Sequence, residues 1–141
     1  ISSVFGLLGI PTQSAYNSAK FAVRGFTDAL RTELDIEQCG VSATTIHPGG
    51  IRTNIARNAR FEFAEHEEAV DAEQAAVDFE RITRTTPEKA ARLILGAVRK
   101  NKRRALIGPD AHLFDAAARI SPRASQWALG KLVARSSGAI V

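Results

Sequence analysis

Apolar residues recur at spacings of three and four between residues 14 and 38, which predicts a long amphipathic helix. The repeating positions, which we expect to face the core, are Tyr16, Ala19, Val23, Phe26, Leu30 and Leu34. At about 100° per residue, a second patch lies on another side of this helix. It consists of Phe21, Ala22, Gly25, Ala29, Thr32 and Ile36. Two apolar sides indicate either deep burial in the domain or a helix contact between two copies of the chain.

Shorter apolar runs on either side of this helix predict strands. The β-branched start at residues 1–5 fits the end of a strand, and a loop with Gly6 and Gly9 leads from it into the helix, for which Gly40 is the expected stop. The run at 41–50 is typical of a buried strand that ends in a turn. A strand, a helix and a second strand in succession predict an α/β layer.

The second half of the chain adds another helix and strand. The acidic segment 54–84 is interpreted as a solvated face rather than a metal site. Thr-Pro-Glu at 86–88 supplies a hydroxyl cap, a first-turn proline and an acid near the positive end of the dipole, which predicts a helix to about residue 100. A strand is expected at 103–108, followed by one or two short helices interrupted at residues 121–122.

The composition is that of a soluble globular domain with an uneven charge distribution. The chain has 141 residues, 45% of them hydrophobic and 24% charged, which suits one domain with its own core. The single cysteine, Cys39, excludes an internal disulfide and fits a reducing compartment, so cytoplasmic localisation is the default expectation. No methionine is present and the chain opens on Ile1, so we expect a piece of a longer protein.

Residues 100–141 carry eight of the 19 Lys and Arg side chains but two of the 15 acidic ones. This basic tail is interpreted first as solvated surface. Weak contact with an anionic membrane surface and recognition of a phosphate-bearing substrate stay open as alternatives. Nucleic acid is not expected as a partner, because Trp127 is the one aromatic platform near most of these charges.

Tyr16 and Lys20 stand four residues apart near the start of the long helix and therefore project into the same space. A free phenol ionises near pH ~10, too high for efficient proton exchange at neutral pH. A cation about 4 Å away, in an effective dielectric of about 20, favours the phenolate by roughly 4 kcal/mol. This spacing is common by chance, but Ser3 lies thirteen residues before Tyr16 at the end of a predicted strand, where open parallel sheets hold their ligands.

The segments "ISSVFGLLGIPTQSAYNSAK" and "IHPGGIRT" resemble the second half of a short-chain dehydrogenase/reductase. That family carries a serine thirteen positions before the tyrosine of Tyr-x-x-x-Lys, and a Pro-Gly-x-x-x-Thr turn after the next strand. The resemblance implies an α/β fold in which residues 1–141 are the C-terminal part of one NAD(P)-binding domain. That domain would be a doubly wound parallel sheet of Rossmann type with three αβα layers, whose Gly-rich N-terminal half is absent here.

The resemblance also implies roles for individual residues. Tyr16 would exchange a proton with the substrate oxygen while hydride moves to or from the nicotinamide of NAD or NADP. Ser3 would hydrogen-bond the same oxygen, and Lys20 would favour the phenolate and hold the ribose hydroxyls. No metal is required. The residues expected to bind the cofactor are Tyr16, Lys20, Pro48, Gly49, Ile51 and Thr53.

An apolar carbonyl compound or secondary alcohol is the expected substrate. The residues that suggest such a pocket, and that would equally suit a core, are Val4, Phe5, Leu7, Leu8, Ile10, Phe61 and Phe63. A homodimer or homotetramer formed through the Tyr16 helix is the expected assembly. Two other functions stay open: a non-catalytic relative serving as a dimerising or regulatory binding module, and a sugar-nucleotide epimerase or dehydratase of the extended branch.

The histidines and Ser2 are further polar residues that could belong to a site. His47 precedes the proline turn and is interpreted as a turn residue, because no partner stands at metal-ligand spacing. His66 and His112 are interpreted as surface residues. Ser2 is a rival to Ser3, but strand alternation points the two side chains to opposite faces, and the thirteen-residue spacing selects Ser3.

Overall fold

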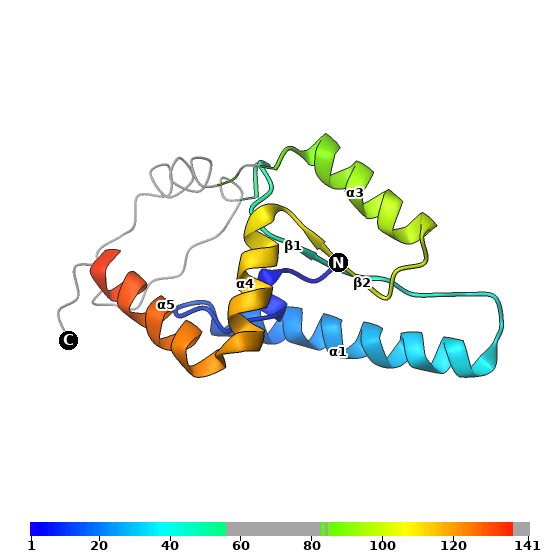
Figure 1. Cartoon of the computed structure of the whole chain (residues 1–141), viewed down its shortest axis with the longest axis horizontal. Coiled ribbons are helices and arrows are strands. Elements are labelled where there is room, and N and C mark those ends of the chain that lie inside the picture. Colours follow the sequence, from blue (N-terminus) through cyan, green and yellow to red (C-terminus); the bar gives the residue numbers. More distant parts are fainter. Residues whose placement is uncertain (56–82, 84, 137–141) are drawn as a thin grey trace.

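The computed structural model describes residues 1–55, 83 and 85–136 and shows an α/β arrangement (Figure 1). In chain order the elements are a 3-10 helix η1 (Val4–Gly6), α1 (Ser14–Glu37), β1 (Thr45–Pro48), α3 (Pro87–Arg99), β2 (Arg104–Ile107), α4 (Pro109–Ile120) and α5 (Pro122–Ser136). Helices α1 and α3 lie on opposite sides of the two strands. Within the described ranges, no helix is long and apolar enough to cross a membrane. The predicted acidic face lies almost entirely outside them.

Strands β1 and β2 pair in parallel over all four residues of each, as the sequence predicted for an α/β layer. The Thr45 amide donates to the Arg103 carbonyl at 3.0 Å, so this peptide group faces β2. Peptide groups alternate along a strand, and the Ile46 carbonyl accordingly points to the other edge, where it accepts the Ser2 amide at 2.8 Å. The chain before η1 therefore runs along the edge of β1 opposite β2.

The strand predicted at residues 1–5 is wrong. Ser3 has extended backbone, but the next three residues form η1, because the Ser3 hydroxyl accepts a hydrogen bond from the Phe5 amide at 3.3 Å and caps the turn. Val4, Leu7 and Leu8 are at most 8% exposed, so these three members of the expected substrate pocket are core residues.

The two strands present an apolar face to α3 and a polar one to α1. The buried core under α3 consists of Ile46, Ala90, Ala97 and Ile107. By strand alternation, Thr45 and His47 lie on the other face of β1. Thr45 donates from its hydroxyl to the Asp28 carboxylate on α1 at 2.8 Å. Hydrophobic burial therefore holds α3 on the sheet, whereas side-chain hydrogen bonds connect α1 to it.

Helix α1 turns a different side toward the strands from the one that its apolar periodicity predicts. Tyr16 is 38% and Phe26 71% exposed, so the predicted core stripe is wrong for these residues. The buried residues of α1 are Asn17 and Arg31. The second apolar patch, defined above by its six residues from Phe21 to Ile36, is exposed. The described part of the chain does not bury this patch.

The remaining helix boundaries follow local signals. Helix α1 ends at Gln38, which adopts a left-handed conformation with φ 52°, two residues before the predicted stop at Gly40. The predicted start of α3 is confirmed, with the Thr86 hydroxyl accepting from the Lys89 amide at 3.3 Å. The predicted break in the tail is also confirmed, since α4 and α5 meet at Ser121.

Candidate active site

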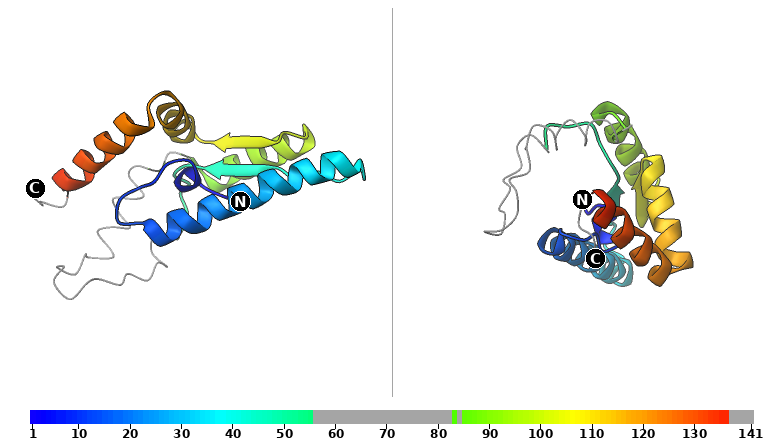
Figure 2. Two further views of the ribbon diagram at one scale, coloured as in Figure 1. Left: turned by 90° about the horizontal axis from the view of Figure 1, so that it is seen from below. Right: turned by 90° about the vertical axis from the view of Figure 1, so that its left-hand side faces the viewer.

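Ser3, the first turn of α1 and the carboxyl end of β1 lie at the same end of the molecule. The chain leaves Ser3 through η1, and α1 then runs back antiparallel to β1, as the left view of Figure 2 shows. The loop between η1 and α1 is held by Asn17, whose side-chain amide exchanges two hydrogen bonds with the backbone of Ile10, at 2.8 and 3.3 Å. This arrangement fixes the start of α1 next to the residues that follow Ser3.

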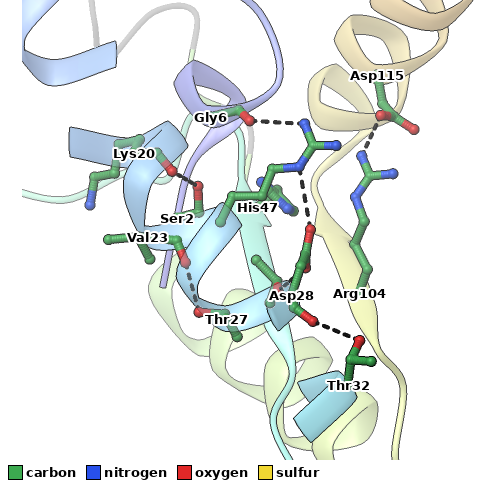
Figure 3. Close-up of polar contacts among 12 residues, drawn as sticks. Ser2, Gly6, Lys20, Val23, Thr27, Asp28, Thr32, His47, Arg104 and Asp115 are labelled. Atoms are coloured by element: carbon green, nitrogen blue, oxygen red, sulfur yellow. Dashed lines mark hydrogen bonds and ion pairs between the residues drawn. The ribbon is translucent and has the colours of Figure 1, made fainter. Parts of the chain in front are cut away.

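Ser2 and Ser3 have different partners, which separates the two candidate hydroxyls. The Ser2 hydroxyl donates to the Lys20 carbonyl of α1 at 2.8 Å (Figure 3), and its residue is 2% exposed. The Ser3 hydroxyl accepts from the Phe5 amide. A hydroxyl that accepts one bond still has its own hydrogen to donate. Ser3 can therefore donate to a substrate oxygen, whereas the Ser2 hydroxyl is used in connecting the N-terminal segment to α1.

Tyr16 and Lys20 lie together on the first turns of α1, as their spacing predicted. The Lys20 ammonium lies over the Tyr16 ring, 5.3 Å from its centroid, and Phe5 meets the same ring edge-on with 5.2 Å between centroids. The cation and Phe5 thus hold the phenol ring from two directions. Because Phe5 is two residues after Ser3, this ring contact connects the phenol to the serine.

The turn after β1 lies against the start of α4. The Gly49 amide donates to the Ile107 carbonyl at 2.9 Å, and the Gly50 amide to the Asp110 carboxylate at 2.6 Å. A Cβ at Gly49 would collide with the Asp110 carboxylate, so a larger residue there would displace this carboxylate from its bond to the Gly50 amide. Further on, Ile51 forms a bridge with Thr85, and the exposed Thr53 follows.

The prediction of His47 as a turn residue is wrong, because it is a fully buried member of β1. Its Nδ1 lies 3.0 Å from the Ser3 carbonyl oxygen. Burial lowers the pKa of His47 below the ordinary imidazole value, and the positive charges of Arg104 and Arg24 lower it further, against the raising effects of the Ser3 bond and Asp28. The neutral imidazole is therefore the form that this site favours. His112 is exposed, as predicted, and His66 lies outside the described residues.

Sequence reasoning missed the polar contacts of α1 that surround this site. The Arg24 guanidinium donates to the Gly6 carbonyl at 3.2 Å and lies 3.6 Å from Asp28. Asp28 in turn accepts from Thr45 on β1. The signal that could have found this face is the spacing of seven between Asn17, Arg24 and Arg31, which places three hydrogen-bonding side chains on one side of the helix.

Two of the residues expected to bind the cofactor present polar groups at this end of the chain. Lys20 presents an ammonium that is partly open to solvent, and Thr53 presents an exposed hydroxyl. Phe61 and Phe63, two of the expected pocket residues, lie outside the described residues.

Comparison with known proteins agrees with this geometry. A family model described as short chain dehydrogenase matches residues 1–62. SadH of Mycobacterium tuberculosis, an oxidoreductase by name, is 46% identical over 121 residues, which cover 85% of this chain and 42% of SadH. YxnA of Bacillus subtilis, named as an uncharacterized oxidoreductase, is 35% identical over 139 residues, which cover 99% of this chain and 36% of YxnA.

A solved structure shows the same fold. The crystal structure of a short-chain dehydrogenase from Streptomyces avermitilis matches with a TM-score of 0.65 and 28% identity, over 96% of this chain and 50% of that protein. The chain thus spans half or less of the length of these relatives. Sequence matches and a solved structure point to one family over the same residues, and the chain accordingly belongs to the short-chain dehydrogenase family, whose Rossmann-type fold its parallel strands share.

Proposed function

We propose that this chain, within its full-length protein, supplies the proton-transfer half of an NAD(P)-dependent oxidoreductase acting on a carbonyl compound or secondary alcohol. The observation that carries the proposal is the placement of Tyr16 and Lys20 on one face of α1, with Ser3 connected to them through the ring contact of Phe5. These three residue types supply a proton donor, a cation beside it and a hydroxyl that can hold the reacting oxygen.

In this proposal Tyr16 donates its phenolic proton to the substrate oxygen during reduction and takes it back during oxidation. Ser3 donates a hydrogen bond to the same oxygen and fixes its position, which lowers the entropic cost of reaching the reactive geometry. The Lys20 ammonium stabilises the phenolate after the proton has left. A nicotinamide cofactor held beside these residues would supply or receive the hydride.

The substrate in this proposal is apolar. Phe5 packs edge-on against the Tyr16 ring, so the surroundings of the phenol include an aromatic wall. Ile10, in the loop after η1, is half-buried and adds an aliphatic side chain to the same loop. An apolar wall beside a few polar groups is the usual composition of a small-molecule site.

The test uses the full-length protein with Tyr16→Phe, which removes the phenolic proton and keeps the ring that Phe5 contacts. Absorbance of reduced nicotinamide is followed with both cofactors and a panel of aliphatic, aromatic and steroid alcohols and ketones. General acid–base catalysis is worth about 10²- to 10⁴-fold, so kcat should fall by that factor while cofactor affinity, measured by fluorescence titration, is retained.

Ser3→Ala and Ser2→Ala form the matched control pair. The Ser3 variant should keep only a small, measurable part of its turnover, and the Ser2 variant should mainly lose stability, because its hydroxyl bonds to the α1 backbone. Turnover that survives Tyr16→Phe would contradict the proposal. Cofactor binding without turnover on any substrate would favour a non-catalytic binding module, and conversion of a sugar nucleotide without net change in cofactor would favour an epimerase.

A further inference from the structure

We propose that His47 is a positioning residue that sets the place of the Ser3 hydroxyl by holding the Ser3 carbonyl from β1. The proposal rests on the proposed function, because it assigns a role in placing a hydroxyl that contacts substrate. It concerns a side chain that no part of that mechanism uses.

The first step is the direction of the hydrogen bond. A carbonyl oxygen only accepts, so the 3.0 Å contact between His47 Nδ1 and the Ser3 carbonyl requires a hydrogen on Nδ1. The imidazole is therefore the Nδ1–H tautomer. The same carbonyl also accepts the Gly6 amide at 3.0 Å. The His47 imidazole on β1 and the Gly6 amide in η1 thus both donate to the Ser3 carbonyl, and together they fix the orientation of the peptide group between Ser3 and Val4.

The second step is the surroundings of the other ring nitrogen. His47 Nε2 is buried and has no hydrogen-bond partner in the described part of the chain. The charged groups that act on the ring are Arg24 and Asp28 of α1 and Arg104 of β2 (Figure 3). Since Nδ1 carries the hydrogen, Nε2 has a lone pair, and the positive charges of Arg24 and Arg104 oppose its protonation, against the smaller opposite effect of Asp28. This field disfavours the doubly protonated ring and supports the neutral tautomer that the Ser3 bond requires.

The third step is where His47 lies along its strand. The next two residues, Pro48 and Gly49, are among those expected to bind the cofactor. Strand β1, which leads into the turn at these residues, thus also holds the segment that contains Ser3 along its edge away from β2. The Ile46 carbonyl accepts the Ser2 amide, and the His47 imidazole contacts the Ser3 carbonyl. His47 consequently fixes the position of the Ser3 hydroxyl, which would contact the substrate, relative to the turn at Pro48 and Gly49, which would contact the cofactor.

The experiment compares His47→Asn with His47→Gln and His47→Leu in the full-length protein. The amide nitrogen of asparagine can occupy the place of Nδ1 and keep the bond to Ser3, the amide of glutamine reaches toward the place of Nε2, and leucine has no donor. Misplacing a group by about 1 Å can cost about 10²-fold in rate. We expect His47→Leu and His47→Gln to lower kcat by about 10- to 100-fold, with a smaller change in KM, and His47→Asn to restore most of it.

A double-mutant cycle with Ser3→Ala separates positioning from general support of the fold. If His47 acts through the Ser3 hydroxyl, His47→Leu should cost little further kcat once that hydroxyl is gone. An equal loss of kcat in the presence and absence of the hydroxyl would overturn the proposal, as would full activity of His47→Leu.

A readout independent of turnover keeps this test distinct from that of the proposed function. The ¹⁵N chemical shifts of His47 in the full-length protein should report a protonated Nδ1 and an unprotonated Nε2. The opposite tautomer, or a doubly protonated ring at neutral pH, would overturn the proposal even if the protein is an active oxidoreductase. The expected tautomer in a protein without turnover would place the failure in the proposed function instead.

Discussion

At the residue scale, the close approach of η1 to α1 depends on Gly6, which has no Cβ. A Cβ at Gly6 would meet the Ser2 hydroxyl oxygen and would lie 2.7 Å from the Lys20 carbonyl oxygen, where a methyl group does not fit. Lys20 belongs to α1 and Ser2 to the chain edge along β1, so the missing methyl group allows both to contact η1. The proposed catalytic residues depend on this close approach.

We therefore predict that Gly6→Ala destabilises the full-length protein by about 1–3 kcal/mol, the usual cost of forcing an extra methyl group into a packed site. Urea unfolding monitored by circular dichroism measures the free energy of unfolding. Gly9→Ala is the matched control, because its Cβ would have nothing within 4 Å and should change stability by less than about 0.5 kcal/mol. Equal stability of the two variants would contradict the packing described for η1.

At the element scale, the two main helices differ in how far the sequence predicts them. The start of α3 was predictable because its cap, proline and acid all act within one turn. The inward side of α1 was not, because it is held by polar contacts: Asn17 bonds to Ile10 in the preceding loop, and Arg31 bonds to Asn101, 70 positions away. Periodicity of apolar residues locates a helix, but it does not identify a side that is held by polar contacts.

In the candidate site, too, some features were predictable from the sequence and others were not. The pairing of Tyr16 with Lys20 follows from helix geometry and was predicted. The preference for Ser3 over Ser2 stays a prediction; the structure shows that the two hydroxyls have different partners. The place of His47 was not predictable, because its partner is the backbone of a residue 44 positions away. A lone histidine before a proline carries no local signal of such a contact.

Arg31 provides the test of this description of α1. Its guanidinium donates to the Ala43 carbonyl at 3.1 Å and to the Asn101 side chain at 2.7 Å, and it pairs with Asp35. Arg31→Met removes these bonds and should lower the free energy of unfolding of the full-length protein by about 1–3 kcal/mol, since Arg31 is buried and three partners lose their donor.

The control for this prediction is Arg99→Met, at an exposed position on α3, which should change stability by less than about 0.5 kcal/mol. Thermal unfolding of the two variants and the parent gives the comparison. A loss confined to Arg99→Met, or none in either variant, would mean that apolar packing rather than Arg31 sets the inward side of α1.

At the scale of the whole molecule, the exposed apolar patch of α1 points to an assembly. Ile36 is 74% and Phe21 41% exposed, and Gly25 and Ala29 between them have small side chains that permit close approach of another helix. The described part of the chain does not cover this patch. Because the chain spans half or less of its relatives, the patch has two possible occupants: the rest of its own protein or a second copy.

We propose the second copy, and Ala29→Glu in the full-length protein tests it. A carboxylate among small apolar residues cannot be buried against an identical helix without losing its hydration, so the variant should dissociate to monomers. Sedimentation velocity measures the change. Ala91→Glu, the same substitution at an exposed position on α3, should leave the assembly intact. A parent protein that is already monomeric, or a soluble Ala29→Glu variant of unchanged mass, would refute the helix contact. A variant that fails to fold would show instead that the patch is covered by the protein's own chain.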